Sequence, residues 1–360
     1  MEERNDSADA VGEGPPLHPP KRERNRGRLV VLASLGAGLG ISVYLLMRSG
    51  DLSTVLLVPA PAHVLALLAL SLDVLARGAR VTFLARGLGL DLPLRASVRA
   101  QLAADALAAA TPFRVGSDPA KIAVMSFHGI GVGAAGALLL GEMAMEATAL
   151  VACGLAIAAG LGGMRWVAIG LFGYAAIVLS VGLLALLLVR APDGEPPGLW
   201  PRVGLGVARW RALGDAITQF RTQARALRSL PARWIAAAQG ATAIHIAARL
   251  AVLPALVLPS VGAAAATPDL VTELVLRPFF VLYATALLPP PGGGGAVEVA
   301  FAAVLSGTLG AAGLAAALIW WRVYTFYLSA AVGGVMLLLP SDTGRSTDRH
   351  RVFSAPGQGA

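Results

Sequence analysis

Charged residues are scarce in this chain of 360 residues. Only 14% of its residues are Asp, Glu, Lys or Arg, whereas 56% are hydrophobic, and the mean hydropathy is +0.69. A soluble domain of this size needs far more charge on its surface, so the composition excludes that class of protein. Apolar runs of about 20 residues, the length that spans a bilayer, recur along the chain. The sequence therefore predicts an all-α, polytopic integral membrane protein.

Cysteine and lysine are almost absent. The one cysteine, Cys153, lies in an apolar run, which excludes a disulfide framework and a cysteine-based zinc site within one chain. Of the 29 basic residues, only Lys21 and Lys121 are lysine. Together with the abundance of alanine and glycine, this bias is typical of a GC-rich coding genome. We therefore expect a protein of a bacterial inner (cytoplasmic) membrane.

Sequence motifs for cofactors and catalysis are missing as well. His63, His128 and His245 lack metal-ligand spacing, which favours roles in the core over metal binding. The run from Gly292 to Gly295 lacks the Lys-Ser/Thr tail of a phosphate loop and does not follow a strand, which argues against nucleotide binding. No nucleophile–base set or pair of catalytic carboxylates stands out. We expect no cofactor, no metal and no enzymatic activity.

The formal net charge is +8, and membrane topology explains its clusters better than nucleic-acid binding does. Residues 1–28 are predicted to form a disordered cytoplasmic tail, and residues 341–360 are predicted to form a second one. The membrane domain between them, 29–340, begins with spans predicted at 29–47 and about 54–76. Arginines that mark the cytoplasmic side follow the second span: Arg77, Arg80, Arg86, Arg95 and Arg99. Both termini are therefore expected to be cytoplasmic.

Residues 95–129 do not have the pattern of a single span. The segment "RASVRAQLAADALAAA" predicts a short, weakly apolar helix, "TPFRVGSDPAK" breaks it, and "IAVMSFHGIG" resumes it. Two half-length helices around a Pro/Gly break are typical of a re-entrant hairpin. Long apolar runs follow at about 130–160 and 164–189.

The one substantial polar connection, residues 191–233, is rich in arginine and is predicted to be cytoplasmic. Apolar residues recur at helical spacing between Val203 and Leu227, and arginines fill the opposite face. The pattern predicts a basic amphipathic helix on the inner membrane surface. A helix packed on other protein is the alternative interpretation.

A second break follows two further predicted spans, at about 234–258 and 271–288. The run "PPPGGGG" from Pro289 to Gly295 stops the helix. A half-helix is predicted at about 296–308, and the last span at about 311–339.

The two broken regions share an ordered series of features. Each has an apolar lead-in, a Pro/Gly break, a charged residue soon after it, a glycine-containing corner and a long helix with a charge in its middle. Pro112 and Glu142 are 30 residues apart, and Pro291 and Arg322 are 31 apart. The series predicts an internal repeat with halves at about 95–189 and 270–339. Interrupted hydrophobic segments at matching positions of two halves point to a transport site.

The first break is predicted to form part of that site. A broken helix exposes unpaired backbone N–H groups, and the N-terminus of a half-helix attracts anions. Ser117 or Asp118 is expected to cap the resumed helix, with Pro119 at its first position. Lys121 then lies in the first turn, where the helix dipole disfavours a cation, so we expect an anionic partner. The candidates for that partner are Asp105, Asp118, Glu142 and a lipid phosphate, with Arg114 in the break as a second cation.

The second break places Glu298 in the first turn of its half-helix, where the dipole favours a carboxylate. Arg322 of the last span, flanked by Tyr324, is the predicted partner. A buried pair of this kind marks a functional site, or else a structural salt bridge that closes the bundle. Glu142 and Glu146 lie one turn apart. We expect Glu142 to pair with a cation, and leave open whether Glu146 pairs or binds a coupling ion.

The segments "TPFRVGSDPAK" and "PPPGGGGAVE", followed by "WWRVYTF", resemble the paired motifs of flippase-like membrane proteins. That family is related to the transmembrane domain of lysylphosphatidylglycerol synthase, the multiple peptide resistance factor. The match to its Pro-Gly-Gly-x-Gly-x-x-Glu element consists of Pro291, Gly292, Gly293, Gly295 and Glu298. The resemblance covers about residues 30–340. It implies a bundle of about eight helices with two re-entrant hairpins and movement of a lipid between leaflets.

Our leading hypothesis is a flippase for an anionic phospholipid or a polyprenyl-linked precursor. The tail 341–360 is too short for the synthase's catalytic domain, so we do not expect synthesis of aminoacyl lipid. The alternative is a non-transporting membrane partner of a glycosyltransferase or lipid-modifying enzyme, docked through the basic helix; an enzyme acting on lipid phosphates is the weakest hypothesis. The residues predicted to bind the lipid are Arg114, Gly116, Ser117, Lys121, Glu142, Gly292, Gly293, Gly295, Glu298, Arg322 and Tyr324.

Overall fold

The computed structural model describes residues 58–160, 165–188, 207–261, 266–284 and 295–338, together with Gly40 and Arg190. Every regular element within these ranges is helical, which confirms the predicted all-α class. The predicted first span, both tails and the segment from Pro289 to Gly294, which includes Gly292 and Gly293, lie outside the described residues.

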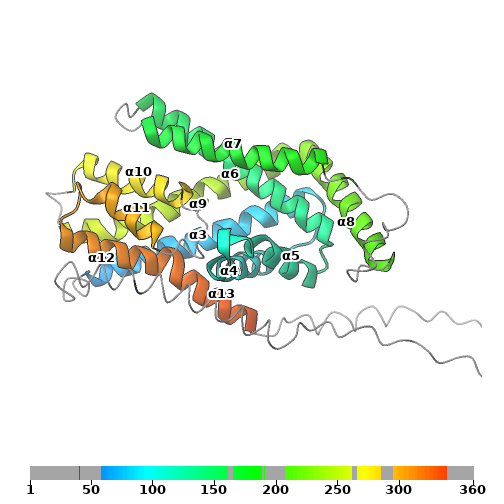
Figure 1. Cartoon of the computed structure of the whole chain (residues 1–360), viewed down its shortest axis with the longest axis horizontal. Coiled ribbons are helices and arrows are strands. Elements are labelled where there is room, and N and C mark those ends of the chain that lie inside the picture. The colour runs from blue at the N-terminus through cyan, green and yellow to red at the C-terminus, as the bar shows by residue number, and fades with distance from the viewer. Residues whose placement is uncertain are drawn as a thin grey trace, which may run out of the picture.

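The helices of the described ranges form one elongated bundle (Figure 1). Four of its helical segments are long and apolar enough to cross a membrane: α6 (Val132–Gly160), α7 (Arg165–Leu188), α9 (Ala232–Val261) and Gly313–Leu338. The last of these combines α12 (Ala311–Arg322), a π-helical turn (Val323–Tyr327) and α13 (Leu328–Leu338). The chain is therefore a multi-pass membrane protein, as the apolar runs predicted.

Large apolar side chains on the outside of the bundle support this conclusion. On α3 (Ala60–Gly87), Val64, Leu68 and Leu75 are each at least half exposed. On α7, Ile169 and Leu188 are 69% and 70% exposed. Apolar surface of this extent is rare on soluble proteins, whereas the acyl chains of a bilayer cover it without cost.

The central helix α3 runs farther than its predicted end near residue 76. It continues to Gly87 and packs along α9. Arg77 and Arg80 are therefore not flanking charges at the membrane surface, as the sequence suggested, but buried residues with 6% and 1% exposure. Arg86, near the end of the helix, is exposed.

The first predicted break is present between α4 (Leu94–Ala110) and α5 (Ser117–Phe127). Phe113 and Arg114 both have positive φ angles, 51° and 57°, a conformation that costs energy for residues other than glycine. The Thr111 hydroxyl donates to the Leu107 carbonyl at 2.7 Å and accepts from the Gly116 N–H at 2.9 Å. These bonds satisfy backbone groups that the break leaves open.

The predicted cap of α5 is wrong. The helix begins at Ser117, so Pro119 is its third residue rather than its first. No side chain caps it, and neither Ser117 nor Asp118 does so. The Thr111 hydroxyl, five residues before Gly116, takes over part of this role because the break turns back on itself.

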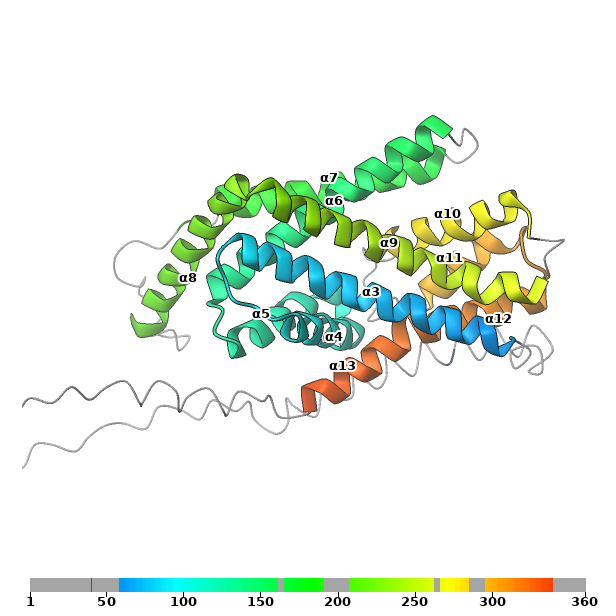
Figure 2. The same cartoon turned by 180° about the vertical axis from the view of Figure 1, so that it is seen from behind.

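The second broken region contains the same order of elements. It runs from α10 (Pro268–Ala284) to α11 (Ala296–Leu305), a corner at Gly310, and the long helix that starts with α12; residues 285–294, where the break is predicted, lie outside the described residues. Gly295, just before α11, has φ 78°, a conformation that favours glycine. Figures 1 and 2 show α5 and α8 at one end of the molecule and α10, α11 and the start of α12 at the other. The two broken regions thus enter the bundle from opposite ends, and their re-entrant position in a bilayer stays a prediction.

The predicted basic helix is α8 (Val207–Ala226). One of its faces packs on the start of α6, where the Gln219 side chain accepts from the Ala134 N–H at 3.3 Å. Gly133 allows this approach, because a Cβ there would collide with the Ala216 carbonyl. The contact agrees with the alternative of a helix packed on protein. The exposed face carries Arg209, Arg211 and Arg225, and its position on the membrane surface stays a prediction.

Adjacent glycines on α13 test the packing of this helix against α4. A Cβ on Gly333 would collide with the Leu102 carbonyl, whereas a Cβ on Gly334 would meet no atom within 4 Å. We expect Gly333→Ala to destabilise the detergent-solubilised protein by about 1–3 kcal/mol, the usual cost of overpacking. Gly334→Ala is the matched control and should unfold like the wild type. Equal melting temperatures for the two variants, measured by scanning fluorimetry, would contradict this packing.

Candidate functional site

Three charged residues lie on one face of α3 and are almost fully buried. Asp73, Arg77 and Arg80 follow one another at intervals of four and three residues, so their side chains point the same way. Their exposures are 2%, 6% and 1%. Charges at this depth are tolerated only when other groups compensate them.

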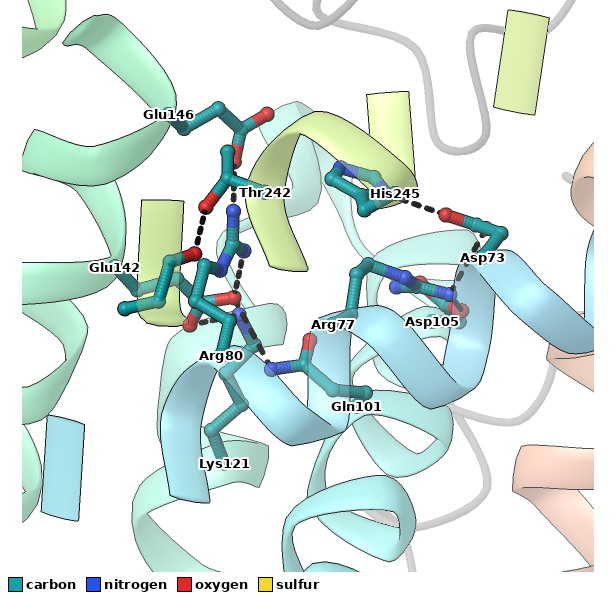
Figure 3. Close-up of polar contacts among 11 residues, drawn as sticks. Asp73, Arg77, Arg80, Gln101, Asp105, Lys121, Glu142, Glu146, Thr242 and His245 are labelled. Atoms are coloured by element: carbon teal, nitrogen blue, oxygen red, sulfur yellow. Dashed lines mark hydrogen bonds and ion pairs between the residues drawn. The ribbon is translucent and has the colours of Figure 1, made fainter. Parts of the chain in front are cut away.

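Arg80 is compensated by two carboxylates of α6 (Figure 3). It forms a short ion pair with Glu142 and another with Glu146 at 3.3 Å. Glu142 also accepts from Lys121 of α5 at 2.8 Å and from Gln101 of α4 at 3.1 Å. The predicted pairing of Glu142 is confirmed, and the partner of Lys121 is Glu142 rather than Asp105 or Asp118. Glu146, whose role the sequence left open, pairs with Arg80.

Arg77 links α3 to α4 and α9. Its two terminal nitrogens donate to the two carboxylate oxygens of Asp105, at 3.0 and 2.8 Å. The same guanidinium lies 3.5 Å from Asp73, one turn earlier on α3. Asp73 in turn forms a short hydrogen bond with Nδ1 of His245 on α9 (Figure 3). A continuous polar chain therefore connects α9, α3 and the first hairpin.

The second broken region has its own buried ion pair. Arg322 Nε donates to Glu298 Oε1 at 2.8 Å, which confirms the predicted pairing. Glu298 has no solvent exposure, and the ring of Phe326 lies 4.4 Å from the Arg322 guanidinium. The π-helical turn begins directly after Arg322. Such turns are frequent at functional sites.

These groups surround a cavity of about 350 Å³. The first break contributes Phe113, Arg114 and Ser117, and the residues on either side of the second break contribute Tyr283 and Val297. Ends of both broken regions therefore meet at one cavity. The charged and ionisable residues in its wall are Arg77, Arg80, Asp105, Arg114, Asp118, Lys121, Glu142, Glu146, Tyr174, His245, Arg249, Tyr283 and Arg322.

Five of the predicted lipid-binding residues line this cavity: Arg114, Ser117, Lys121, Glu142 and Arg322. Glu298 lies behind Arg322 and holds it, and Gly116 and Gly295 flank the breaks without lining the cavity. Tyr324 does not line it either; its hydroxyl lies 3.1 Å from His63 Nδ1.

Several cavity residues were not predicted from the sequence to belong to the site: Arg77, Arg80, Gln101, His245 and Arg249. A signal for some of them was present, because Asp73, Arg77 and Arg80 share a face of α3. His245 and Arg249 likewise lie one turn apart on α9. The positive-inside rule explained the arginines of α3 as charges that flank a membrane span, so their shared face with Asp73 was not interpreted as part of a site.

Two cavity arginines have no ion pair within the described residues. Arg114 belongs to the strained break, and Arg249 donates a hydrogen bond to the Thr325 carbonyl at 3.3 Å. The Nε atom of Arg249 is buried and has no hydrogen-bond partner among these residues. Arginine binds phosphate and carboxylate groups through several N–H donors at once. The arrangement is therefore suited to an anionic ligand.

Metal binding is not indicated by the side chains of the described helices, in which no cluster of three or more His, Cys, Asp or Glu residues has a suitable geometry. The carboxylates of Asp73, Asp105, Glu142 and Glu298 instead face arginine, lysine or histidine.

Comparison with known proteins identifies one family. A family model described as the lysylphosphatidylglycerol synthase TM region matches residues 30–333. No curated protein matches the chain.

Two glutamate–arginine pairs at 2.8 Å provide a test of the buried site. Glu298→Gln removes a fully buried partner of Arg322, and we expect a loss of about 3–5 kcal/mol in the free energy of unfolding. Glu273→Gln removes the partly exposed partner of Arg277, one turn away on α10, and should cost less than about 1 kcal/mol. Chemical denaturation in detergent measures both values. A cost for Glu298→Gln no larger than that of the control would contradict the buried pair.

Proposed function

The chain belongs to the family of the lysylphosphatidylglycerol synthase TM region, and we propose that it moves an anionic lipid between the leaflets of the membrane. The substrate class is a phospholipid or a polyprenyl-linked precursor with a phosphate in its head group. The observation that carries the proposal is the polar cavity between the two broken regions, with two arginines that form no ion pair with the carboxylates of the described residues. A purely structural bundle has no need for such a cavity at membrane depth.

Arg249 and Arg114 are proposed to hold the phosphate. Both line the cavity, and neither forms an ion pair within the described part of the chain. Lys121 and Arg322 lie in the same wall but are held by Glu142 and Glu298. Their carboxylates would compensate these two cations when no lipid is bound, which leaves Arg249 and Arg114 to attract the phosphate.

The arrangement of the broken regions supports movement across the membrane. In Figure 1 the helices of the two broken regions lie toward opposite ends of the bundle, with α5 toward one end and α10 and α11 at the other. We propose that each region separates the cavity from one side of the membrane. Transporters often place their substrate site between two such halves near the middle of the bilayer. We propose that rearrangement of either hairpin opens the cavity to one leaflet. An ion gradient, the membrane potential or simple scrambling would drive the movement.

We propose that the end carrying α8 faces the cytoplasm of a bacterial cell, with both termini on that side. Exposed arginines gather there, at Arg86 and along α8. Basic residues are enriched in cytoplasmic segments of membrane proteins. The protein is proposed to act as a transporter and not as an enzyme.

The alternative function, a docking partner for a lipid-modifying enzyme, is favoured by one observation. The exposed arginines of α8 form a basic face that could bind such a protein or anionic lipid head groups. A docking partner would not depend on the residues inside the cavity, and this difference separates the two functions.

Lipid movement is tested in proteoliposomes that contain fluorescent phosphatidylglycerol. Dithionite quenches only the outer leaflet, so the slow phase of the quench reports movement between leaflets. We expect Arg249→Ala to slow this phase about tenfold or more, because it removes a charged hydrogen-bond donor for the phosphate. Arg86→Ala, an exposed arginine outside the cavity, should match the wild type. Equal rates for empty liposomes and wild-type protein would contradict the proposed function.

Lipid retention gives an independent prediction. We expect native mass spectrometry to detect a distinct anionic lipid on the wild-type protein and its loss from Lys121→Ala and Glu298→Gln. The first change removes a cavity cation, and the second releases Arg322 from its position. The same unselective lipid shell on all three proteins would contradict a cavity site and would favour the docking function.

A further inference from the structure

We propose that His245, together with Asp73, forms a proton-binding site that takes up one proton when the cavity binds a lipid phosphodiester. The inference rests on the proposed function, because it names the ion that accompanies the lipid. It concerns a buried pair whose role the binding of phosphate does not explain.

The deep part of the site has balanced formal charges when His245 is neutral. Its cations are Arg77, Arg80, Lys121, Arg249 and Arg322. Its carboxylates are Asp73, Asp105, Glu142, Glu146 and Glu298. The other two charges in the wall, Arg114 and Asp118, have opposite signs and lie at exposed positions.

A phosphodiester disturbs this balance by adding one negative charge. An uncompensated charge at membrane depth is costly, so a positive charge should enter with it. Histidine is the side chain whose ordinary pKa, about 6.5, allows a change of charge near neutral pH. His245 is the histidine in the wall of the described cavity.

The geometry around His245 suits a bound proton. Its exposure is only 2%, and its Nδ1 forms a short hydrogen bond with Asp73. That contact fixes the ring and would stabilise the imidazolium form through the carboxylate charge. Asp73 is also 3.5 Å from Arg77, which joins the first hairpin through Asp105. Protonation of His245 would strengthen its bond with Asp73 and weaken the contact between Asp73 and Arg77.

Charged and titratable groups reach the surroundings of His245 from each helix packed on this part of α9. They are Asp73, Arg77 and Arg80 from α3, Glu146 from α6, Tyr283 from α10, Arg322 from α12 and Arg249 from α9 itself.

Arg249 couples binding of the proton to binding of the lipid. It lies four residues after His245, and residues at this spacing are neighbours on a helix. A phosphate bound at Arg249 would offset the repulsion between the guanidinium and a protonated ring. Binding of the anion therefore favours binding of the proton, and linkage requires the reverse effect to be equally large.

This coupling determines which charges would cross the membrane together. One proton and one monoanionic head group carry no net charge across the membrane together. Their movement should therefore respond to a pH gradient rather than to the membrane potential, which acts only on net charge.

Proton uptake on lipid binding is the direct test. Detergent-purified protein is placed in weak buffer with a pH-indicating dye, at several values between about pH 6 and 8, where histidine titrates. Short-chain phosphatidylglycerol is added, with short-chain phosphatidylcholine as the neutral control, and native mass spectrometry counts the lipid bound. We expect uptake that approaches one proton per phosphatidylglycerol, and none with phosphatidylcholine.

The outcomes separate this inference from the proposed function. Binding of phosphatidylglycerol without proton uptake would overturn the proton site and leave lipid binding intact. No binding at all would overturn both. Equal uptake per bound lipid by His245→Gln would assign the proton to another group and overturn the inference. His128→Gln, at the corner between α5 and α6, is the control and should take up protons like the wild type.

A second variant covers the case in which His245→Gln binds no lipid. Asp73→Asn removes the carboxylate charge beside the ring but keeps a polar side chain of similar size. We expect the pH profile of proton uptake to move to lower pH, because the imidazolium loses its stabilising partner. An unchanged profile would overturn the assignment to this pair.

Discussion

Compensation of the charges on α3 is the constraint on which the rest of the structure depends. Arg77 and Arg80 are almost fully buried, so carboxylates of other helices must compensate their charges. Arg77 forms an ion pair with Asp105 of α4, and Arg80 forms one with Glu142 of α6. Because Lys121 shares Glu142, the position of α5 is fixed by the same group. One network of ion pairs thus holds the first broken hairpin against the central helix.

The second broken region follows the same principle with the charges exchanged. In the first half a lysine of the half-helix pairs with a glutamate of the long helix, and in the second a glutamate pairs with an arginine, Arg322. Each pair fixes a half-helix whose broken end would otherwise expose backbone groups at membrane depth. The cavity lies where the two halves meet. The ion pairs form the framework of the site, and the arginines outside them, Arg114 and Arg249, are its proposed anion-binding groups.

The features that depend on local signals could be predicted from the sequence. Pro, Gly and charge spacing predicted the first break, which the structure describes, whereas the second, Pro289 to Gly294, lies outside the described residues. Glu142 was one of four candidate partners for Lys121, and the structure pairs the two. The chain-distant contacts could not be predicted, because Arg77 and Arg80 meet carboxylates 28 and 62 residues away. Without those partners the arginines resemble the cytoplasmic flank of a span. The contact of α8 with α6 was equally ambiguous, since an amphipathic face suits both lipid and protein.

The most direct test of the account is an electron cryo-microscopy structure of the protein in nanodiscs that contain phosphatidylglycerol. We expect head-group density inside the cavity, with the phosphate within hydrogen-bonding distance of Arg249 or Arg114 and the Glu142 and Glu298 ion pairs intact. Lipid density confined to the outer surface of the bundle, beside a cavity filled by its own side chains, would contradict it.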